Sequence, residues 1–211
     1  MRKPGNLIIL TAPSGTGKST LVHLLLERIS NLVFSVSYTT RAPRTHEAHG
    51  RDYYFVDARK FAEMVDEGRF LEWAPVHGNN YGTCEELLNE HLEAGRDVLL
   101  DIDIHGANQV QRKRTDAVSI FLLPPTFEEL KRRLEGRATE TPGSIQCRLE
   151  RARREVLHYE EFDYVVINEM TESSFDELRA IIGAERCRPD CRKDRIADII
   201  STFVEKKEKV L

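Results

Sequence analysis

Residues 11–20 read TAPSGTGKST, a stretch whose residue types suit the binding of phosphate. Gly17, Lys18 and Ser19 match the end of the phosphate-loop pattern G-x-x-x-x-G-K-[ST], while Ala12 stands where the first glycine is usual. In such a loop backbone N–H groups wrap the phosphates, the lysine reaches the β- and γ-phosphates, and the hydroxyl binds Mg²⁺. Ala12 falls at the end of a predicted strand, where a negative φ admits alanine. The alternative is a plain strand-to-helix turn, and the motif favours a triphosphate site.

A second group of side chains, between residues 37 and 103, could receive the phosphoryl group. Arg41 and Arg44 lie in TTRAPR, and two arginines in one loop are suited to grip a phosphate monoester. Carboxylates such as Glu72 and Asp103 accept hydrogen bonds from N1 and N2 of guanine, which adenine does not offer. Hydroxyl groups could add contacts to phosphate or base: Tyr53, Tyr81 and Thr83. Each alone could be an ordinary surface or core residue, but their clustering favours a site.

Both groups must be positioned by regular elements, and the apolar pattern predicts which. Short apolar runs typical of buried strands, each followed by a helical pattern, occupy residues 6–11, 97–103, 118–123 and 164–168. Alternation of strand and helix predicts an α/β fold with a parallel sheet covered on both faces. The candidate phosphate loop then lies between the first strand and the helix that follows it.

Residues 33–95 have a different texture and predict a lobe inserted into this core. Alternating apolar and polar residues at 34–40 and 52–56 predict strands of a small mixed sheet, and residues 70–76 follow a helical pattern at 57–68. A polar segment with Gly and Pro, residues 136–144, is flanked by Arg133, Arg137 and Arg148. It predicts either a mobile lid or a simple surface connection.

Length and composition favour one substantial domain. The 211 residues carry a net charge of −4, which argues against a dedicated nucleic-acid binder. No apolar run approaches the ~20 residues that span a bilayer, and MRKPGN leads straight into a strand. We therefore expect a soluble cytoplasmic protein without a signal peptide or membrane contact. Four cysteines fit a reducing compartment, and free thiols are favoured over a metal site at Cys187 and Cys191.

The sequence resembles the guanylate kinase family over roughly residues 6–186. The resemblance is carried by APSGTGKST, FSVSYTTRAPR, GRDYYFV, FLEWA, GNNYGT, LDIDIHGA, RRLEGRATE and YVVIN. It implies a P-loop containing nucleoside triphosphate hydrolase fold and transfer of phosphate from MgATP to GMP, and to dGMP, in purine nucleotide metabolism. The implied domain is 4–187, with core segments 4–32 and 96–187, a GMP-binding lobe 33–95 and a lid at about 136–148. Residues 188–211 are expected to form a helical tail.

The resemblance also implies site residues by position. The GMP phosphate would meet Ser37, Arg41, Arg44, Tyr53 and Tyr81, and the guanine would meet Glu72, Thr83 and Asp103. The ATP side would use Ala12, Pro13, Ser14, Gly15, Thr16, Gly17, Lys18, Ser19 and Thr20, with Asn168 near the adenine. The catalytic cations would be Lys18, Arg41, Arg44 and the lid arginines Arg137 and Arg148. Mg²⁺ would be bound by Ser19, with Asp101 acting through water. ATP and GMP are the expected partners, and homo-oligomerisation is left open.

Some positions depart from the family pattern without removing a phosphate-binding residue. Asn80 replaces the first of two tyrosines common before Gly82, and Ala138 stands where the lid often has glycine. An alanine there would slow or bias closure if that backbone needs a positive φ.

Two other functions fit parts of the same pattern. A related kinase fold phosphorylates a phosphorylated sugar, but such an acceptor leaves Glu72, Thr83 and Asp103 without a purpose. Guanylate-kinase-like domains also serve as protein-binding scaffolds that have lost ATP binding, and the intact Gly15, Gly17, Lys18 and Ser19 argue against that role. We therefore predict an enzyme with GMP as acceptor.

Overall fold

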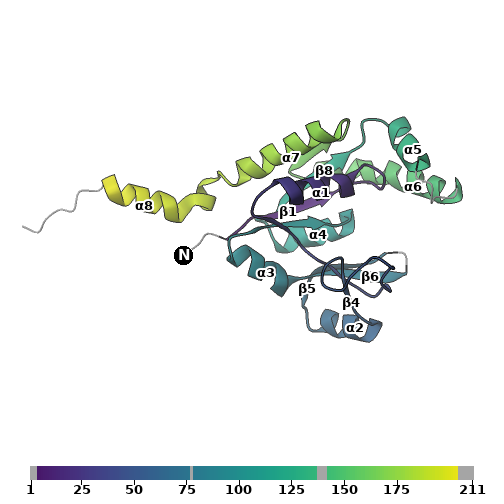
Figure 1. The fold of residues 1–211 in the computed structure, drawn as a ribbon, viewed down its shortest axis with the longest axis horizontal. Coiled ribbons are helices and arrows are strands. Elements are labelled where there is room, and N and C mark those ends of the chain that lie inside the picture. Colours follow the sequence, from purple (N-terminus) through teal and green to yellow (C-terminus); the bar gives the residue numbers. More distant parts are fainter. Residues whose placement is uncertain (1–3, 77, 137–141, 204–211) are drawn as a thin grey trace, which may run out of the picture.

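The core of the molecule is a parallel sheet (Figure 1), seen in a computed structural model that describes residues 4–76, 78–136 and 142–203. Its strand order is β2-β7-β1-β8-β9, and every neighbouring pair runs parallel. The strands are β1 (Leu7–Thr11), β2 (Leu32–Phe34), β7 (Asp97–Asp101), β8 (Val118–Leu123) and β9 (Tyr164–Ile167). β1 and β8 lie in the interior of the sheet and are almost wholly buried, as continuous apolar runs require. The parallel α/β prediction is confirmed.

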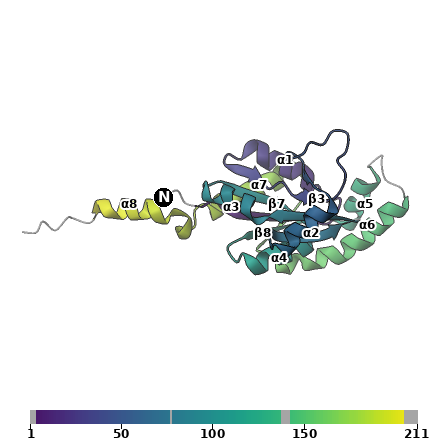
Figure 2. The ribbon, with the colours of Figure 1, turned by 90° about the horizontal axis from the view of Figure 1, so that it is seen from below.

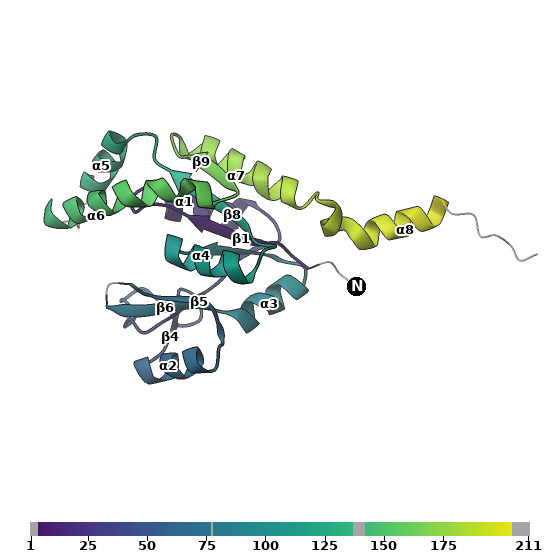
Figure 3. The same ribbon diagram turned by 180° about the vertical axis from the view of Figure 1, so that it is seen from behind.

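Helices cover both faces of this sheet (Figures 1 and 3). α1 (Lys18–Arg28) and α7 (Thr171–Glu185) pack on one face, where Leu21, Leu25 and Leu178 join the strand residues of one apolar cluster. α3 (Glu85–Glu93) and α4 (Ile104–Lys113) cover the other face through a second cluster that contains Leu88 and Val110. Because both faces are covered, the carboxyl ends of the strands are where loops and substrates can meet.

The inserted lobe contains a second sheet, with strand order β4-β3-β6-β5. Its elements are β3 (Tyr38–Thr39), β4 (Tyr54–Phe55), α2 (Ala58–Asp66), β5 (Phe70–Val76) and β6 (Asn79–Cys84). α2 begins where the Asp57 side chain accepts a hydrogen bond from Lys60 N, and it packs Phe61 and Met64 against Phe70. The lobe is narrower than the predicted residues 33–95, because β2 pairs with β7 in the core and α3 packs on the core sheet.

Helix α4 ties the inserted lobe to the core through the backbone of β5. Lys113 Nζ donates to the carbonyls of Phe70 and Leu71, at 3.1 and 2.7 Å. Gln109 Nε2 donates to Trp73 O at 2.9 Å, and Trp73 N donates back to Gln109 Oε1 at 3.3 Å. Two long polar side chains of one helix therefore fix the strand that carries Glu72.

Beyond β8 the chain forms a two-helix arm. α5 (Phe127–Glu135) and α6 (Pro142–Glu155) pack through Leu130, Leu134, Leu149 and Ala152, and η1 (Val156–Glu161) leads to β9. The predicted lid, about 136–148, therefore ends in a helix. Arg137 and Ala138 lie outside the described residues.

The chain then extends away from the body (Figure 2), through η2 (Pro189–Arg192) into α8 (Lys193–Phe203). Helix α8 exposes a set of apolar side chains, Ile196, Ile199, Ile200 and Phe203. All four cysteines are free of disulfide bonds. Among residues 4–76, 78–136 and 142–203, no helix has the length and apolar character needed to cross a membrane.

Candidate active site

The phosphate loop connects β1 to α1, as the motif predicts, and two glycines shape it. Gly15 and Gly17 have φ of 94° and 104°, in the left-handed region that favours glycine. A Cβ at Gly17 would lie 2.5 Å from Asn168 Nδ2, so no larger residue fits without displacement. α1 begins at Lys18, which leaves the first N–H groups of the helix available to an anion. Ala12 follows directly after the last residue of β1, as predicted for the position where the motif usually has glycine.

A polar cavity of about 250 Å³ lies over this loop. Most of its lining comes from the predicted ATP-binding segment: Ala12, Pro13, Ser14, Gly15, Gly17, Lys18 and Ser19. Thr16 and Thr20, predicted with them, do not line it. Thr16 is buried, and its hydroxyl donates to Pro13 O at 2.7 Å, so it stabilises the turn from within.

Asn168, predicted to lie near the adenine, has its side chain behind the phosphate loop. It is 4% exposed, and its Nδ2 donates to Thr16 O at 2.7 Å. Ser174 Oγ donates to Asn168 Oδ1 at 3.0 Å. Arg133 on α5 donates to the carbonyls of Thr16 and Asn168, at 3.0 and 2.9 Å. The Asn168 amide therefore braces the loop and lines neither of the two cavities described in this section.

We expect Asn168→Ala to lower the free energy of unfolding by about 1–3 kcal/mol, because the Thr16 carbonyl and the Ser174 hydroxyl lose buried partners. The same change loosens the loop, so the KM for MgATP should rise. Denaturant unfolding and initial-rate kinetics measure the two effects. Asn108→Ala is the matched control, since Asn108 makes an exposed side-chain hydrogen bond to Glu161. Equal losses in the two variants would contradict the bracing role.

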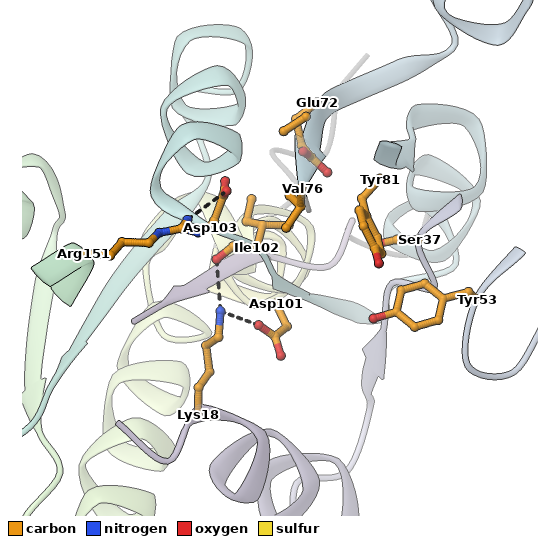
Figure 4. Close-up of a pocket in the computed structure, with 11 residues that line it drawn as sticks. Lys18, Ser37, Tyr53, Glu72, Val76, Tyr81, Asp101, Ile102, Asp103 and Arg151 are labelled. Carbon is orange, nitrogen blue, oxygen red and sulfur yellow. Dashed lines mark hydrogen bonds and ion pairs between the residues drawn. The ribbon is translucent and has the colours of Figure 1, made fainter. Parts of the chain in front are cut away.

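A second cavity, of about 320 Å³, lies between the two sheets and faces both lobes (Figure 4). Its lining includes five of the eight predicted acceptor-binding residues: Ser37, Tyr53, Glu72, Tyr81 and Asp103. Ala74, Val76, Asp101 and Ile102 complete it together with Lys18 and Arg151. The fold therefore brings side chains from the inserted lobe and from the core sheet around one space.

Lys18 lines both cavities. Its Nζ lies 2.5 Å from Asp101 Oδ1 and donates to Ile102 O at 3.1 Å, as the dashed lines in Figure 4 mark. Asp101 ends β7 and Lys18 begins α1, so the pair spans two neighbouring strand ends of the parallel sheet. A single ammonium group thus lies where the loop cavity meets the second cavity.

Glu72 is the most deeply placed acid of the second cavity, at 5% exposure. Burial raises the pKa of its carboxyl to about 7, and the hydrogen bond from Thr83 Oγ1, 2.6 Å long, opposes that rise. Asp103 nearby raises the pKa further, and Lys113 lowers it. Thr83 was predicted to contact the base, and here it lies behind Glu72 and orients it. The Glu72 carboxylate fits here because residue 106 is glycine, since a Cβ at Gly106 would lie 2.8 Å from Glu72 Oε2.

The two predicted phosphate-gripping arginines differ in their placement. Arg41 Nε donates to Tyr81 OH at 3.2 Å, and its guanidinium lies 5.3 Å from the centroid of the Tyr53 ring. Its NH2 pairs with Glu47 at 2.9 Å, which lowers the pKa of Glu47 and raises that of Arg41. Arg44 is exposed and lines neither cavity, although its backbone N–H donates to Glu47 Oε2.

Sequence reasoning missed two residues of α6 that the structure places at the site. Arg151 lines both cavities and Glu155 lines the loop cavity, whereas the predicted lid residue Arg148 lines neither. Arg151 follows Arg148 by three positions, so the two share one side of the helix. That spacing is the signal that could have identified Arg151.

The oxygen atoms that Ser19 and Asp101 could offer a metal suit an ion that binds together with a nucleotide. Within the described ranges, no cluster of three or more His, Cys, Asp or Glu side chains could hold a metal ion. Ser19 presents a hydroxyl in the loop cavity, and Asp101 presents a carboxylate beside Lys18. Oxygen donors of this kind suit Mg²⁺, whose remaining ligands are commonly waters and substrate phosphates.

A parallel sheet with a glycine loop at its first strand, joined to a second lobe across a shared cavity, defines a phosphate-loop nucleotide kinase. The family model for guanylate kinase matches residues 4–185. A guanylate kinase of Dechloromonas aromatica is 49% identical over 191 residues, covering 87% of this chain and 95% of that protein. One of Aromatoleum aromaticum is 51% identical over 185 residues, covering 88% and 91%. The chain belongs to the guanylate kinase family.

A solved structure supports the same assignment. The crystal structure of guanylate kinase from Anaplasma phagocytophilum has a TM-score of 0.72 and 37% sequence identity, and the match covers 90% of each chain. Similarity of sequence and of fold therefore extends over both lobes rather than over the phosphate loop alone.

Proposed function

We propose that the chain transfers the γ-phosphoryl group of MgATP to GMP, giving ADP and GDP, with the loop cavity as donor site and the second cavity as acceptor site. The observation that carries this division is Lys18, which lines both cavities. A group that moves from one nucleotide to the other must pass the point where the two sites meet. Membership of the guanylate kinase family supports GMP as the acceptor.

The reaction needs charge neutralisation more than a strong base. The attacking group is a phosphate oxygen that is already ionised, so catalysis rests on alignment and on offsetting the repulsion of two anions. Lys18 lines both cavities, and we assign the same task to Arg41, which lines neither cavity but whose guanidinium contacts two residues of the second cavity, Tyr53 and Tyr81. We assign further phosphate contacts to Arg44, Arg148 and Arg137 on closure, of which Arg137 lies outside the described residues.

Guanine is distinguished by its hydrogen-bond donors. Glu72 and Asp103 line the acceptor cavity and, when ionised, only accept hydrogen bonds. Guanine donates from N1 and from the amino group at C2, whereas adenine presents neither donor. Thr83 keeps one Glu72 oxygen oriented, so the other is available to the base. The two carboxylates, of which Glu72 is buried, therefore select against AMP, because an acceptor without these donors leaves them unpaired.

Mg²⁺ enters with ATP in this proposal. The Ser19 hydroxyl would hold it, and Asp101 would act through a coordinated water. When bound, the ion neutralises charge on the phosphates. Asp101 pairs with Lys18 in the structure, so the carboxylate that would act on the ion lies beside the ammonium group that would meet the phosphates. A reducing cytoplasm remains the location we propose, in keeping with the four free thiols.

An acceptor panel in a coupled ADP-release assay tests the function. We expect kcat/KM for GMP and dGMP to exceed that for AMP, UMP, CMP and ribose 1,5-bisphosphate by at least about a thousandfold, because unpaired polar groups reject analogues strongly. Equal rates with AMP and GMP would refute guanine recognition. A preference for the sugar phosphate would replace the acceptor altogether. Absence of MgATP binding in a calorimetric titration of folded protein would instead indicate a binding module.

A further inference from the structure

We propose that Arg151 is a positioning residue that neutralises and orients Asp103 and Glu155, and thereby sets the affinity of the enzyme for both substrates. The inference rests on the proposed function, since it assigns a role within the donor and acceptor sites. It concerns a residue outside both the phosphate-loop motif and the arginine pair of the inserted lobe.

Arg151 lies between two acids that come from different elements. Its Nε is 2.5 Å from Glu155 Oε1, one turn later on α6, and its NH2 is 3.9 Å from Asp103 Oδ2 at the start of α4. Figure 4 shows the guanidinium reaching Asp103 from the α6 side of the cavity. The side chains of Glu155 and Asp103 are 15% and 33% exposed, so solvent screens them only in part.

Both acids face the site where phosphates bind. Glu155 lines the loop cavity, and Asp103 lines the loop cavity and the acceptor cavity. Two uncompensated carboxylates here would repel a triphosphate, whereas the guanidinium between them offsets that repulsion. The other cation beside Asp103 in both linings is Lys18, whose Nζ is already paired with Asp101. Arg151 therefore reduces the electrostatic repulsion between the acids of the two cavities and a bound nucleotide phosphate.

Arg151 also completes the orientation of Asp103. Asp103 caps α4, and its Oδ1 accepts from Gly106 N at 2.9 Å. The NH2 group of Arg151 lies 3.9 Å from the other carboxylate oxygen, Asp103 Oδ2. The hydrogen bond from Gly106 N fixes one oxygen, and the charge of Arg151 draws the other oxygen toward α6. The two together favour one plane of the carboxylate, which determines how it meets the donors of a guanine. Loss of Arg151 should therefore weaken GMP binding through Asp103, without a direct contact between Arg151 and the base.

The variant Arg151→Gln separates these effects by kinetics. We expect the KM for GMP and the KM for MgATP each to rise by about threefold to tenfold, with kcat within about twofold of wild type, because a partly exposed pair is lost from the ground-state sites. Arg154→Gln is the matched control, since Arg154 is an exposed arginine of α6 that lines neither cavity. It should leave all three constants within about twofold.

A double variant distinguishes charge compensation from direct contact with phosphate. If Arg151 acts by neutralising Glu155, Arg151→Gln/Glu155→Gln should reverse most of the rise in the KM for MgATP, because Glu155, the acid closest to Arg151, then carries no charge. The KM for GMP should stay raised, because Asp103 still lacks its partner. Calorimetric titration of GMP into each variant gives the same comparison without turnover and requires only folded protein.

The outcomes that overturn the proposal differ from those that overturn the function. A fall in kcat of about a hundredfold with both KM values unchanged would mean that Arg151 contacts the transferred group. Constants equal to those of Arg154→Gln would mean that the ion pairs are incidental. Either result can occur in an enzyme that phosphorylates GMP, whereas a wild-type protein inactive on GMP would contradict the proposed function first.

Discussion

Lys18→Ala should lower kcat by about a thousandfold while changing the KM for GMP by less than about threefold, because the ammonium group acts on charge that develops at the phosphoryl group in transit. Lys18 lines both cavities and is paired with Asp101 and the Ile102 carbonyl in the structure. Steady-state rates at saturating MgATP and GMP measure the effect.

Two comparisons make the Lys18 result specific. Lys60→Ala removes an exposed lysine of α2 that pairs with Glu63, and it should leave kcat unchanged. Thermal unfolding of Lys18→Ala should resemble that of wild type, since Asp101 is partly exposed and can be solvated. A Lys18→Ala enzyme that retains a tenth or more of the wild-type kcat would contradict the assignment.

Glu72→Gln should weaken GMP binding by about 30-fold to 100-fold. The substitution replaces a buried carboxylate, which only accepts hydrogen bonds, with an amide whose NH2 group would face the N–H donors of guanine. Titration calorimetry with GMP measures this. The KM for MgATP should change little, since Glu72 lines only the acceptor cavity. Glu86→Gln, an exposed acid of α3, is the control and should bind GMP as wild type does. Unchanged GMP affinity in Glu72→Gln would remove this residue from base recognition.

The same Glu72→Gln substitution, which should weaken GMP binding, should raise the free energy of unfolding at pH 8. Burial raises the pKa of Glu72 from 4.5 to about 7, so the folded protein holds a proton that the unfolded chain releases. The free energy of unfolding therefore falls as pH rises from about 4.5 to 7, by up to about 3 kcal/mol from this group. Glu72→Gln removes that dependence and should be more stable than wild type at pH 8. GMP binding to the wild type should strengthen over the same interval, as the carboxylate forms.

Denaturant unfolding at pH 5 and pH 8 checks the stability change. A wild-type protein whose stability relative to Glu72→Gln is the same at both values would show that the Glu72 pKa is not raised. Glu86→Gln again provides the comparison, since an exposed acid contributes little to such a difference.

The sequence could predict what depends on local pattern and could not predict what depends on side-chain direction. Gly17 and Lys18 were found because a left-handed turn before a helix restricts residue type, and the strands were found because both faces of the sheet are buried. No sequence pattern shows whether the Asn168 side chain hydrogen-bonds to the backbone of the phosphate loop or contacts the nucleotide. Arg151 shares one side of α6 with Arg148, but which of the two reaches the cavities depends on how far along the helix they lie, and this is set by the packing of α6.

The placement of Asp103 and Thr83 shows the same limit. The run 97–103 predicted a strand that ends at Asp103, whereas β7 ends at Asp101 and Asp103 caps α4. Thr83 was assigned to the base, and the 2.6 Å hydrogen bond shows that it serves Glu72. The partner of Thr83 follows from the register of β5 and β6, and one partner of Asp103 lies on α6, so neither can be found from a local pattern.

Helix α4 has a consequence for when the base is recognised. It carries Asp103 at its first end, and through Gln109 and Lys113 it holds the strand that carries Glu72. A single helix therefore sets the distance between the Glu72 and Asp103 carboxylates. Relative movement of the two lobes should change this distance less than it changes other distances across the second cavity. In the function proposed above, purines would then be distinguished when the nucleotide first binds.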